Sequence, residues 1–185
     1  FTMPAEALAK AIQKTIFATS TDDLRPAMTG VYFELAENSA TFVATDAHKL
    51  MKYSRTDIQC PKEDHFIAPK KPLNLLRGTL PTDSTTLKIS YSSSYLFVEH
   101  GSVEVACRLI DARFPDYRVV IPSDNPYKLT VNTGDFQSAL RRVGVFSNKS
   151  TNLVSVSITG SELQFNAQDM DYSFEGTERM PCRYA

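Results

Sequence analysis

Short runs of apolar residues recur along the chain in the same order three times. Each time, an extended apolar segment leads into a stretch with apolar residues three and four positions apart, and strand-like stretches separated by polar turns follow. The first pattern predicts helices over 5–20, 69–80 and 135–146, whose starts are about 65 residues apart. Because the three stretches share little sequence identity, the repeat is one of architecture.

The predicted strands are joined by turns of a few polar residues. They cover 1–4, 30–36, 40–45, 50–58, 65–68, 86–91, 95–100, 102–110, 127–131, 153–158, 163–168 and 172–183. Strands connected by such short turns must be antiparallel neighbours. The predicted fold class is therefore α+β, with repeated β-α-β-β-β units and the helices on one face of antiparallel sheets.

The stretch from Pro122 to Pro126 is the best candidate for a linker. It divides the chain into 1–122, which holds two complete units, and 123–185, which holds one. The sequence starts with Phe1 and stops at Ala185 inside a predicted strand, so we expect an excerpt of a longer protein.

The predicted helices have one apolar and one basic face. Leu8, Ile12 and Ile16 form the apolar stripe of the first helix, and Leu73, Leu76 and Leu80 that of the second. The third helix, which Thr133 or Asp135 is expected to cap, buries Phe136, Leu140 and Val143. The basic residues in these helices or just after the third are Lys10, Lys14, Lys70, Lys71, Arg77, Arg141, Arg142 and Lys149.

Charge is distributed unevenly between the helices and the remaining chain. The helices, with Lys149, carry eight basic and two acidic residues, whereas the remainder carries 12 basic and 19 acidic residues. The net charge of −1 excludes a generally basic nucleic-acid binder, but not a locally basic surface able to neutralise phosphates. No apolar run is long enough to span a membrane.

The three cysteines favour a reducing, cytoplasmic environment. Cys60, Cys107 and Cys182 are widely spaced, and none has a second Cys or a His at metal-ligand spacing. We therefore expect buried thiols, no disulfide, no metal and no cofactor.

Two motifs are more specific than these patterns. The first runs from Val43 to Leu50 (VATDAHKL) and the second from Leu109 to Arg118 (LIDARFPDYR). With the repeat and Asp23-Leu24-Arg25, they resemble the bacterial DNA polymerase III beta subunit family, the sliding clamps. The family patterns ATDGHRL and DGRFPDYRRVLP appear here with Ala47 and Ala112 in place of glycines, and with Lys49 and Val119 in place of arginines.

The resemblance implies a DNA-clamp fold and a non-catalytic polymerase subunit. A clamp protomer has three similar domains of two repeats each, and two protomers close into a ring around duplex DNA, with the helices lining the hole. The resemblance matches 1–122 to the second domain and 123–185 to the first half of the third. The ring closes between a first and a third domain, and this fragment matches no first domain and only half of a third, so it is expected to be monomeric or weakly associated.

The resemblance also implies two binding surfaces. DNA would face Lys10, Lys14, Lys70, Lys71, Arg77, Arg141 and Arg142 without sequence preference. The polymerase III alpha subunit, the clamp loader and repair polymerases would insert linear peptides into a hydrophobic cleft. The cleft residues carried over are Arg25, Met28, Thr45, Ala47, His48, Leu50, Pro115 and Val120.

Two other classes of protein remain as alternatives. In an enzyme, Thr45, Asp46 and His48 would act as nucleophile, acid and base of a hydrolase, or Asp46 and His48 would bind a metal. No third metal ligand and no Gly-rich phosphate loop accompanies them. A β-rich peptide or carbohydrate module would have no reason to align basic residues of several helices on one concave surface.

Overall fold

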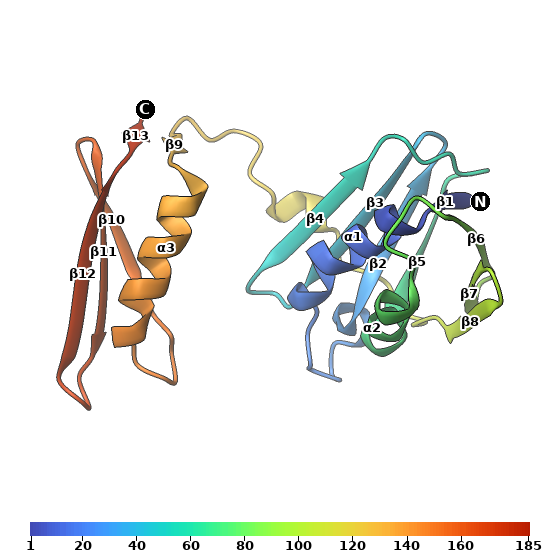
Figure 1. Cartoon of the computed structure of the whole chain (residues 1–185), viewed down its shortest axis with the longest axis horizontal. Helices are drawn as coiled ribbons and strands as arrows, with labels where there is room; N and C mark the ends of the chain where they lie inside the picture. Colours follow the sequence, from blue (N-terminus) through green and yellow to red (C-terminus); the bar gives the residue numbers. More distant parts are fainter. The chain divides into compact units, whose positions relative to one another are not determined.

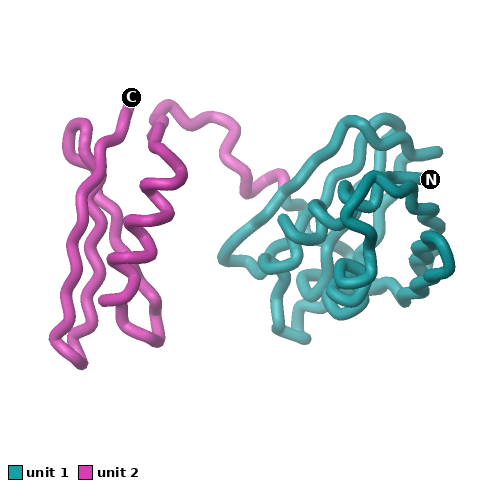
Figure 2. The backbone as a smooth tube through the Cα atoms, viewed as in Figure 1, with its two compact units in different colours: residues 1–117 teal, residues 118–185 magenta.

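The structure, a computed structural model, describes residues 1–185 and divides them into two compact units. Unit 1 comprises residues 1–117 and unit 2 residues 118–185 (Figure 2). This division falls five residues before the expected boundary after residue 122. The physical reason is Tyr117, which is buried in unit 1 and donates a 2.6 Å hydrogen bond from its hydroxyl to Glu34.

Two four-stranded antiparallel sheets form most of unit 1. One has the order β4-β3-β2-β5 and the other the order β1-β6-β7-β8 (Figure 1). The strands are β1 (Thr2–Pro4), β2 (Gly30–Ala36), β3 (Ser39–Thr45), β4 (Leu50–Arg55), β5 (Asp64–Pro69), β6 (Thr86–Tyr91), β7 (Tyr95–His100) and β8 (Val103–Arg108). The predicted antiparallel pairing is confirmed, and the ranges predicted for β2, β6 and β7 agree residue for residue.

Two helices, α1 (Ala5–Thr15) and α2 (Lys70–Thr79), pack on these sheets and against each other. The core lies between helices and strands, where Leu8 and Ile12 of α1 and Leu73 and Leu76 of α2 are buried in one cluster with Phe42. The predicted apolar faces of both helices are thus confirmed. Each such side chain contributes about 1.5–3 kcal/mol to folding when fully buried, so this cluster is the main support of unit 1.

Helix α1 is shorter than the predicted range 5–20. The Thr15 hydroxyl donates to the carbonyl of Ala11 at 2.7 Å, and the chain continues as a 3₁₀ helix over Ile16–Ala18. A hydroxyl that bonds back to the preceding turn competes with helix extension. The helical hydrophobic pattern therefore extends beyond the α-helix itself.

Unit 2 has one helix, α3 (Thr133–Val143), that packs on a three-stranded antiparallel sheet (Figure 1). The sheet has the order β10 (Ser155–Thr159), β11 (Glu162–Asp169) and β12 (Phe174–Pro181), and β9 (Leu129–Thr130) pairs with β13 (Arg183–Tyr184). Val143 is buried against Leu163 and Phe165, with Phe136 and Leu140 partly buried beside them. These contacts confirm the predicted apolar face of α3.

The ends of α3 differ from the prediction. Asn132 is the N-cap, because its side-chain oxygen accepts the backbone N–H groups of Gly134 at 2.9 Å and Asp135 at 3.1 Å. The expectation of a Thr133 or Asp135 cap was therefore wrong by one to three residues. The α-helix ends at Val143 and a 3₁₀ turn follows, so Lys149 lies beyond it.

Candidate functional site

The basic side chains of α1 and α2 are free of ion pairs. Lys10, Lys14, Lys71 and Arg77 are exposed, Lys70 is half-buried, and none of the five forms a salt bridge. By contrast, cations of the sheets and loops commonly pair with a nearby acid, as Lys88 does with Glu99 at 3.0 Å. The two helices therefore present uncompensated positive charge to solvent.

A hollow of about 420 Å³ lies where α1 and α2 meet. Lys10 and Gln13 line it from α1 and Arg77 lines it from α2, with Glu6 as its single acid. Lys14, Lys70 and Lys71 are not part of its lining. Two of the five basic residues of unit 1 thus converge on one concave surface, from helices that are about 65 residues apart in sequence.

The two arginines of α3 behave differently from each other. Arg142 forms a bidentate ion pair with Glu178 of β12, with its Nε 2.9 Å from a carboxylate oxygen. This pairing lowers the pKa of Glu178 and raises that of Arg142. Arg141 is exposed and forms no ion pair. Of the residues expected to face DNA, Arg142 is therefore the one whose charge the protein itself compensates.

A rigid turn connects β3 to β4 and contains Thr45, Ala47 and His48. The buried Thr45 hydroxyl donates to the carbonyl of Lys49 at 2.8 Å and accepts the N–H of Ala47 at 3.1 Å. Asp46 accepts the N–H groups of His48 at 3.0 Å and Lys49 at 2.9 Å. Ala47 and His48 are exposed at the tip, where Ala47 has a left-handed φ of 76°.

Electrostatics further tighten this turn. The Lys49 ammonium group and the backbone N–H groups of the turn hold the pKa of Asp46 well below its ordinary value. The side chains of Thr45 and Asp46 thus form their hydrogen bonds within the turn. No side-chain-to-side-chain hydrogen bond connects Thr45, Asp46 and His48. This arrangement argues against the hydrolase alternative, which needs a nucleophile in contact with a base.

A pocket of about 440 Å³ brings together three of the expected cleft residues. Arg25 and Met28 line one side of it, and Pro115 lines the other. The Arg25 guanidinium is held by Asp22 through a 2.9 Å ion pair, which fixes the arginine at the rim. Apolar walls with a positioned charge at the edge suit the binding of an apolar anchor.

Leu50 belongs to the apolar cluster beside this pocket. It starts β4, is half-buried, and packs against the cluster of Val43, Ile67, Phe114 and Tyr117. Phe114 also lines the pocket, so cluster and pocket share a wall. Thr45, Ala47 and His48 are not part of its lining, and Val120 belongs to unit 2, where it is 66% exposed.

Sequence reasoning missed several residues of this pocket. Ala27, Ala112, Arg113 and Phe114 all line it. The motif from Leu109 to Arg118 was the available signal, because it contains three of them. Ala27 had no signal, since only the fold brings the 3₁₀ helix Pro26–Thr29 to this motif.

The structure contains neither a metal-binding cluster nor a disulfide. No group of three His, Cys, Asp or Glu side chains is placed to hold a metal ion. The three cysteines are free, and burial raises the pKa of the Cys60 and Cys107 thiols. None of the helices has the length and apolar character needed to cross a membrane.

Comparison with known proteins identifies the fold and the family. Residues 2–116 match the model of the family described as DNA polymerase III beta subunit, central domain. The beta sliding clamp of Borreliella burgdorferi is 28% identical over 184 residues, which cover 92% of this chain and 47% of that protein. The chain thus spans about half the length of such relatives.

Solved structures agree with this match. The DNA polymerase III subunit beta of Pseudomonas aeruginosa superposes with a TM-score of 0.94 at 24% identity, over 100% of this chain and 50% of that one. The beta subunit of Thermotoga maritima gives a TM-score of 0.90 at 26% identity, with the same coverage. The fold is that of a clamp, and the chain belongs to the DNA polymerase III beta subunit family.

Proposed function

We propose that the protein is a sliding clamp, a non-catalytic processivity factor that encircles duplex DNA and tethers the replicative polymerase. The observation that carries this proposal is the set of unpaired cations on α1 and α2, with Lys10 and Arg77 on one hollow. Flexible basic side chains on rigid helices attract phosphates without reading bases. This is the electrostatic requirement for a protein that holds DNA and still slides along it.

The same proposal assigns the apolar pocket to partner proteins. An apolar side chain of a linear peptide would enter between Met28 and Pro115, beside Leu50 and the turn that carries His48. The peptides would come from the polymerase III alpha subunit, the clamp loader and repair polymerases. Thr45 and Ala47 would contribute by shaping that turn.

The assembly follows from the same assignment. Unit 1 corresponds to a complete second clamp domain and unit 2 to the first half of a third domain. The full-length protein would form a ring-shaped homodimer in the cytoplasm, where it needs neither a metal nor a cofactor. A β-rich module unrelated to DNA is the weaker alternative, since it gives no reason for the convergence of Lys10 and Arg77.

Binding of duplex DNA to the full-length protein tests the proposal. Replacing Lys10 and Arg77 by Gln removes two phosphate contacts, so the salt dependence of the binding constant should fall by about one unit of slope per residue. Fluorescence anisotropy of a labelled duplex, titrated at several salt concentrations, measures this slope.

The matched control replaces cations that already have partners. Lys88→Gln and Arg179→Gln remove charges that pair with Glu99 and Glu162 on the sheets, and should leave the slope unchanged. If the control pair lowers the slope as much as the helix pair does, the assignment of DNA to the helices is wrong.

A further inference from the structure

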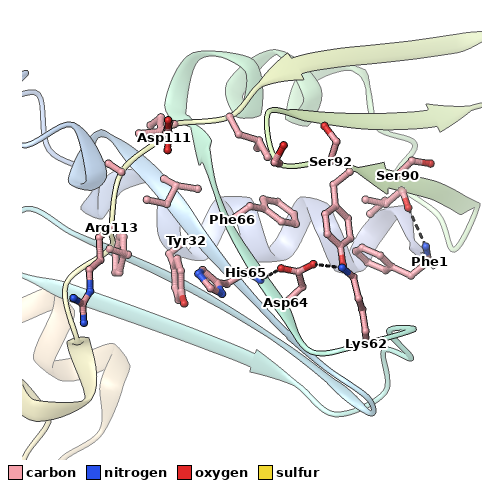
Figure 3. Close-up of a pocket in the computed structure, with 18 of the residues that line it drawn as sticks. Phe1, Tyr32, Lys62, Asp64, His65, Phe66, Ser90, Ser92, Asp111 and Arg113 are labelled. Atoms are coloured by element: carbon pink, nitrogen blue, oxygen red, sulfur yellow. Dashed lines mark hydrogen bonds and ion pairs between the residues drawn. The ribbon is translucent and has the colours of Figure 1, made fainter.

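A second cleft of unit 1 has no role in the function proposed above. It has a volume of about 780 Å³, within the usual range of ligand sites. Residues 64–67 of β5 form one wall, and the turn after β6 and the segment 109–114 form the others (Figure 3). β5 is the last strand of its sheet, and one backbone hydrogen bond, from Ile110 to Ile67 at 3.0 Å, joins it to that segment.

Aromatic rings follow one another along this cleft. Tyr32 stacks on Phe114 with ring centroids 4.6 Å apart, and Phe66 lies 5.0 Å from Tyr91. Figure 3 shows Tyr32 and Phe66 along its length, and Tyr91, the ring neighbour of Phe66, also lines the cleft. Such a wall favours an aromatic or other flat apolar side chain, which can add to the existing ring contacts.

The charges of the cleft exclude a polyanion. Its lining has two cations and two acids, and Lys62 and Asp64 neutralise each other at 2.7 Å. Asp111 and Arg113 remain on the rim without ion pairs. Because nucleic-acid binding requires a surplus of positive charge, this balance favours a peptide.

The edge of β5 is poorly suited to an added strand. The N–H of His65 donates to the carboxylate of Asp64 at 2.9 Å, and the carbonyl of Ile67 accepts the N–H of Ile110 at 3.0 Å, so two groups that a new strand would need are occupied. Charged side chains at a sheet edge have the same protective effect. We therefore expect recognition in this cleft to use side chains rather than strand pairing.

The cleft shares a wall with the pocket assigned to partner peptides. Ala112, Arg113 and Phe114 line both cavities. Of these three, Ala112 presents only a methyl group to the two cavities. Arg113 is exposed and forms no ion pair, so its guanidinium is available to a carboxylate on a chain that extends from one cavity to the other.

We propose that the cleft binds the segment that flanks the anchor residues of a partner peptide. The segment would carry one aromatic side chain, for the rings of Tyr32, Phe66 and Tyr91, and a neighbouring carboxylate for Arg113. This inference rests on the proposed peptide pocket, which it extends into a two-part site. It predicts that partner sequences are read beyond their apolar anchors.

Two labelled peptides and the full-length protein test the proposal. A core peptide carries only consecutive Leu and Phe anchors, and an extended peptide adds a flank with one aromatic residue and one aspartate. We expect the extended peptide to bind about ten-fold more tightly, which is the size of a moderate anchor contribution. Equal affinities of the two peptides for the wild-type protein would overturn the proposal.

Neighbouring serines in one exposed turn provide a matched pair of variants. Ser93 lines the cleft and Ser94 does not. Ser93→Trp should abolish the gain of the extended peptide and leave binding of the core peptide unchanged, whereas Ser94→Trp should preserve the gain. A Ser93→Trp protein that retains the gain would contradict the assignment.

The carboxylate contact has its own test. Asparagine in place of the flank aspartate should weaken peptide binding to the wild-type protein but not to the Arg113→Gln variant. If the effects of the two substitutions on affinity are additive, Arg113 does not contact the flank carboxylate. The flank alone, titrated against isotope-labelled protein, should shift the amide signals of residues 90–93. The two experiments test the anchor pocket and the cleft separately. If the core peptide does not bind, the anchor pocket is refuted. If the flank causes no shifts, or if a single-stranded oligonucleotide causes the same shifts, the cleft assignment is refuted.

Discussion

The side chains of Thr45 and Asp46 hold the backbone of the turn from Thr45 to Lys49. Thr45 and Asp46 together accept three backbone N–H groups, and the Thr45 hydroxyl donates to the carbonyl that closes the turn. The chain at the tip must therefore adopt a left-handed conformation, which falls on Ala47 at a φ of 76°. Glycine would be the natural residue there, so Ala47 carries local strain.

Ala47→Gly should stabilise the protein. Removing the strain of a left-handed alanine raises the free energy of unfolding by about 1–2 kcal/mol, while the greater flexibility of glycine in the unfolded chain lowers it by about 0.4–1 kcal/mol. The expected net gain is about 0.5–1 kcal/mol in the free energy of unfolding, measured by urea denaturation. Ala106→Gly, in the exposed strand β8, should lower stability instead, and a gain there as well would show that strain at Ala47 is not the cause.

Asp46→Asn should change how stability depends on pH. A carboxylate whose pKa is lowered by folding stabilises the folded state above its unfolded pKa, and this stabilisation is lost as the pH falls. The variant should therefore be less stable than the wild type at pH 7, and the difference should shrink below about pH 4. Urea midpoints at both pH values measure it, with Asp23→Asn as the exposed control; a difference that does not depend on pH would contradict the interpretation.

At the scale of elements, sequence patterns located the strands and helices but misplaced some of their ends, such as that of β4, which ends at Arg55 and not at residue 58. The alternation in 86–91 and the polar turn at 92–94 fix strand and turn together, and β6 and β7 match the prediction. The end of α1 was predicted too late in the sequence, because Ile16 continues the apolar stripe although the α-helix has already ended. Periodicity reports which side chains are buried, not which backbone hydrogen bonds form.

Sequence patterns could not predict the contacts between elements that are distant in the chain. Arg142 is 36 residues from Glu178, and nothing in its own helix indicates that β12 will neutralise its charge. The wall that the two cavities share is equally hidden, since the cleft forms only when β5 meets the segment 109–114, and the pocket only when the 3₁₀ helix Pro26–Thr29 meets residues 112–116. The candidate site was therefore predictable as a set of motif residues, but not as a division into two cavities.

Two glycines in unit 1 should respond in opposite ways to alanine. A Cβ on Gly30 of β2 would lie 2.5 Å from the carbonyl oxygen of Ala68, whereas one on Gly78 of α2 would meet nothing within 4 Å. Gly30→Ala should destabilise by about 1–3 kcal/mol through overpacking, and Gly78→Ala should stabilise by about 0.5 kcal/mol through helix propensity. Urea denaturation of both variants measures this, and a neutral Gly30→Ala would mean that the strands can separate at no cost.

At the scale of the whole molecule, the two proposed binding surfaces differ in whether their cations form ion pairs. Several cations on sheets and turns have acidic partners, such as Arg25 with Asp22 and Lys49 with Asp46, and these pairs hold local geometry. Cations on α1 and α2 have none and remain available to a polyanion. The apolar pocket has the paired Arg25 at its rim, which suits a peptide, so under the proposed function DNA and protein partners would use different surfaces.

The final prediction concerns Leu50 and the proposed peptide pocket. Leu50→Ala removes an apolar contact from the cluster of Val43, Ile67, Phe114 and Tyr117, which adjoins the pocket. A peptide with consecutive Leu and Phe anchors should lose about 1–3 kcal/mol of binding free energy to the full-length protein. Met51→Ala is the matched control, because Met51 follows in the same strand but packs against the main core of unit 1. Both truncations should lower stability, so circular dichroism must first establish that the variants are folded, but only Leu50→Ala should weaken the peptide. If the two variants bind the peptide equally well, Leu50 belongs to the core alone and the anchor must enter elsewhere.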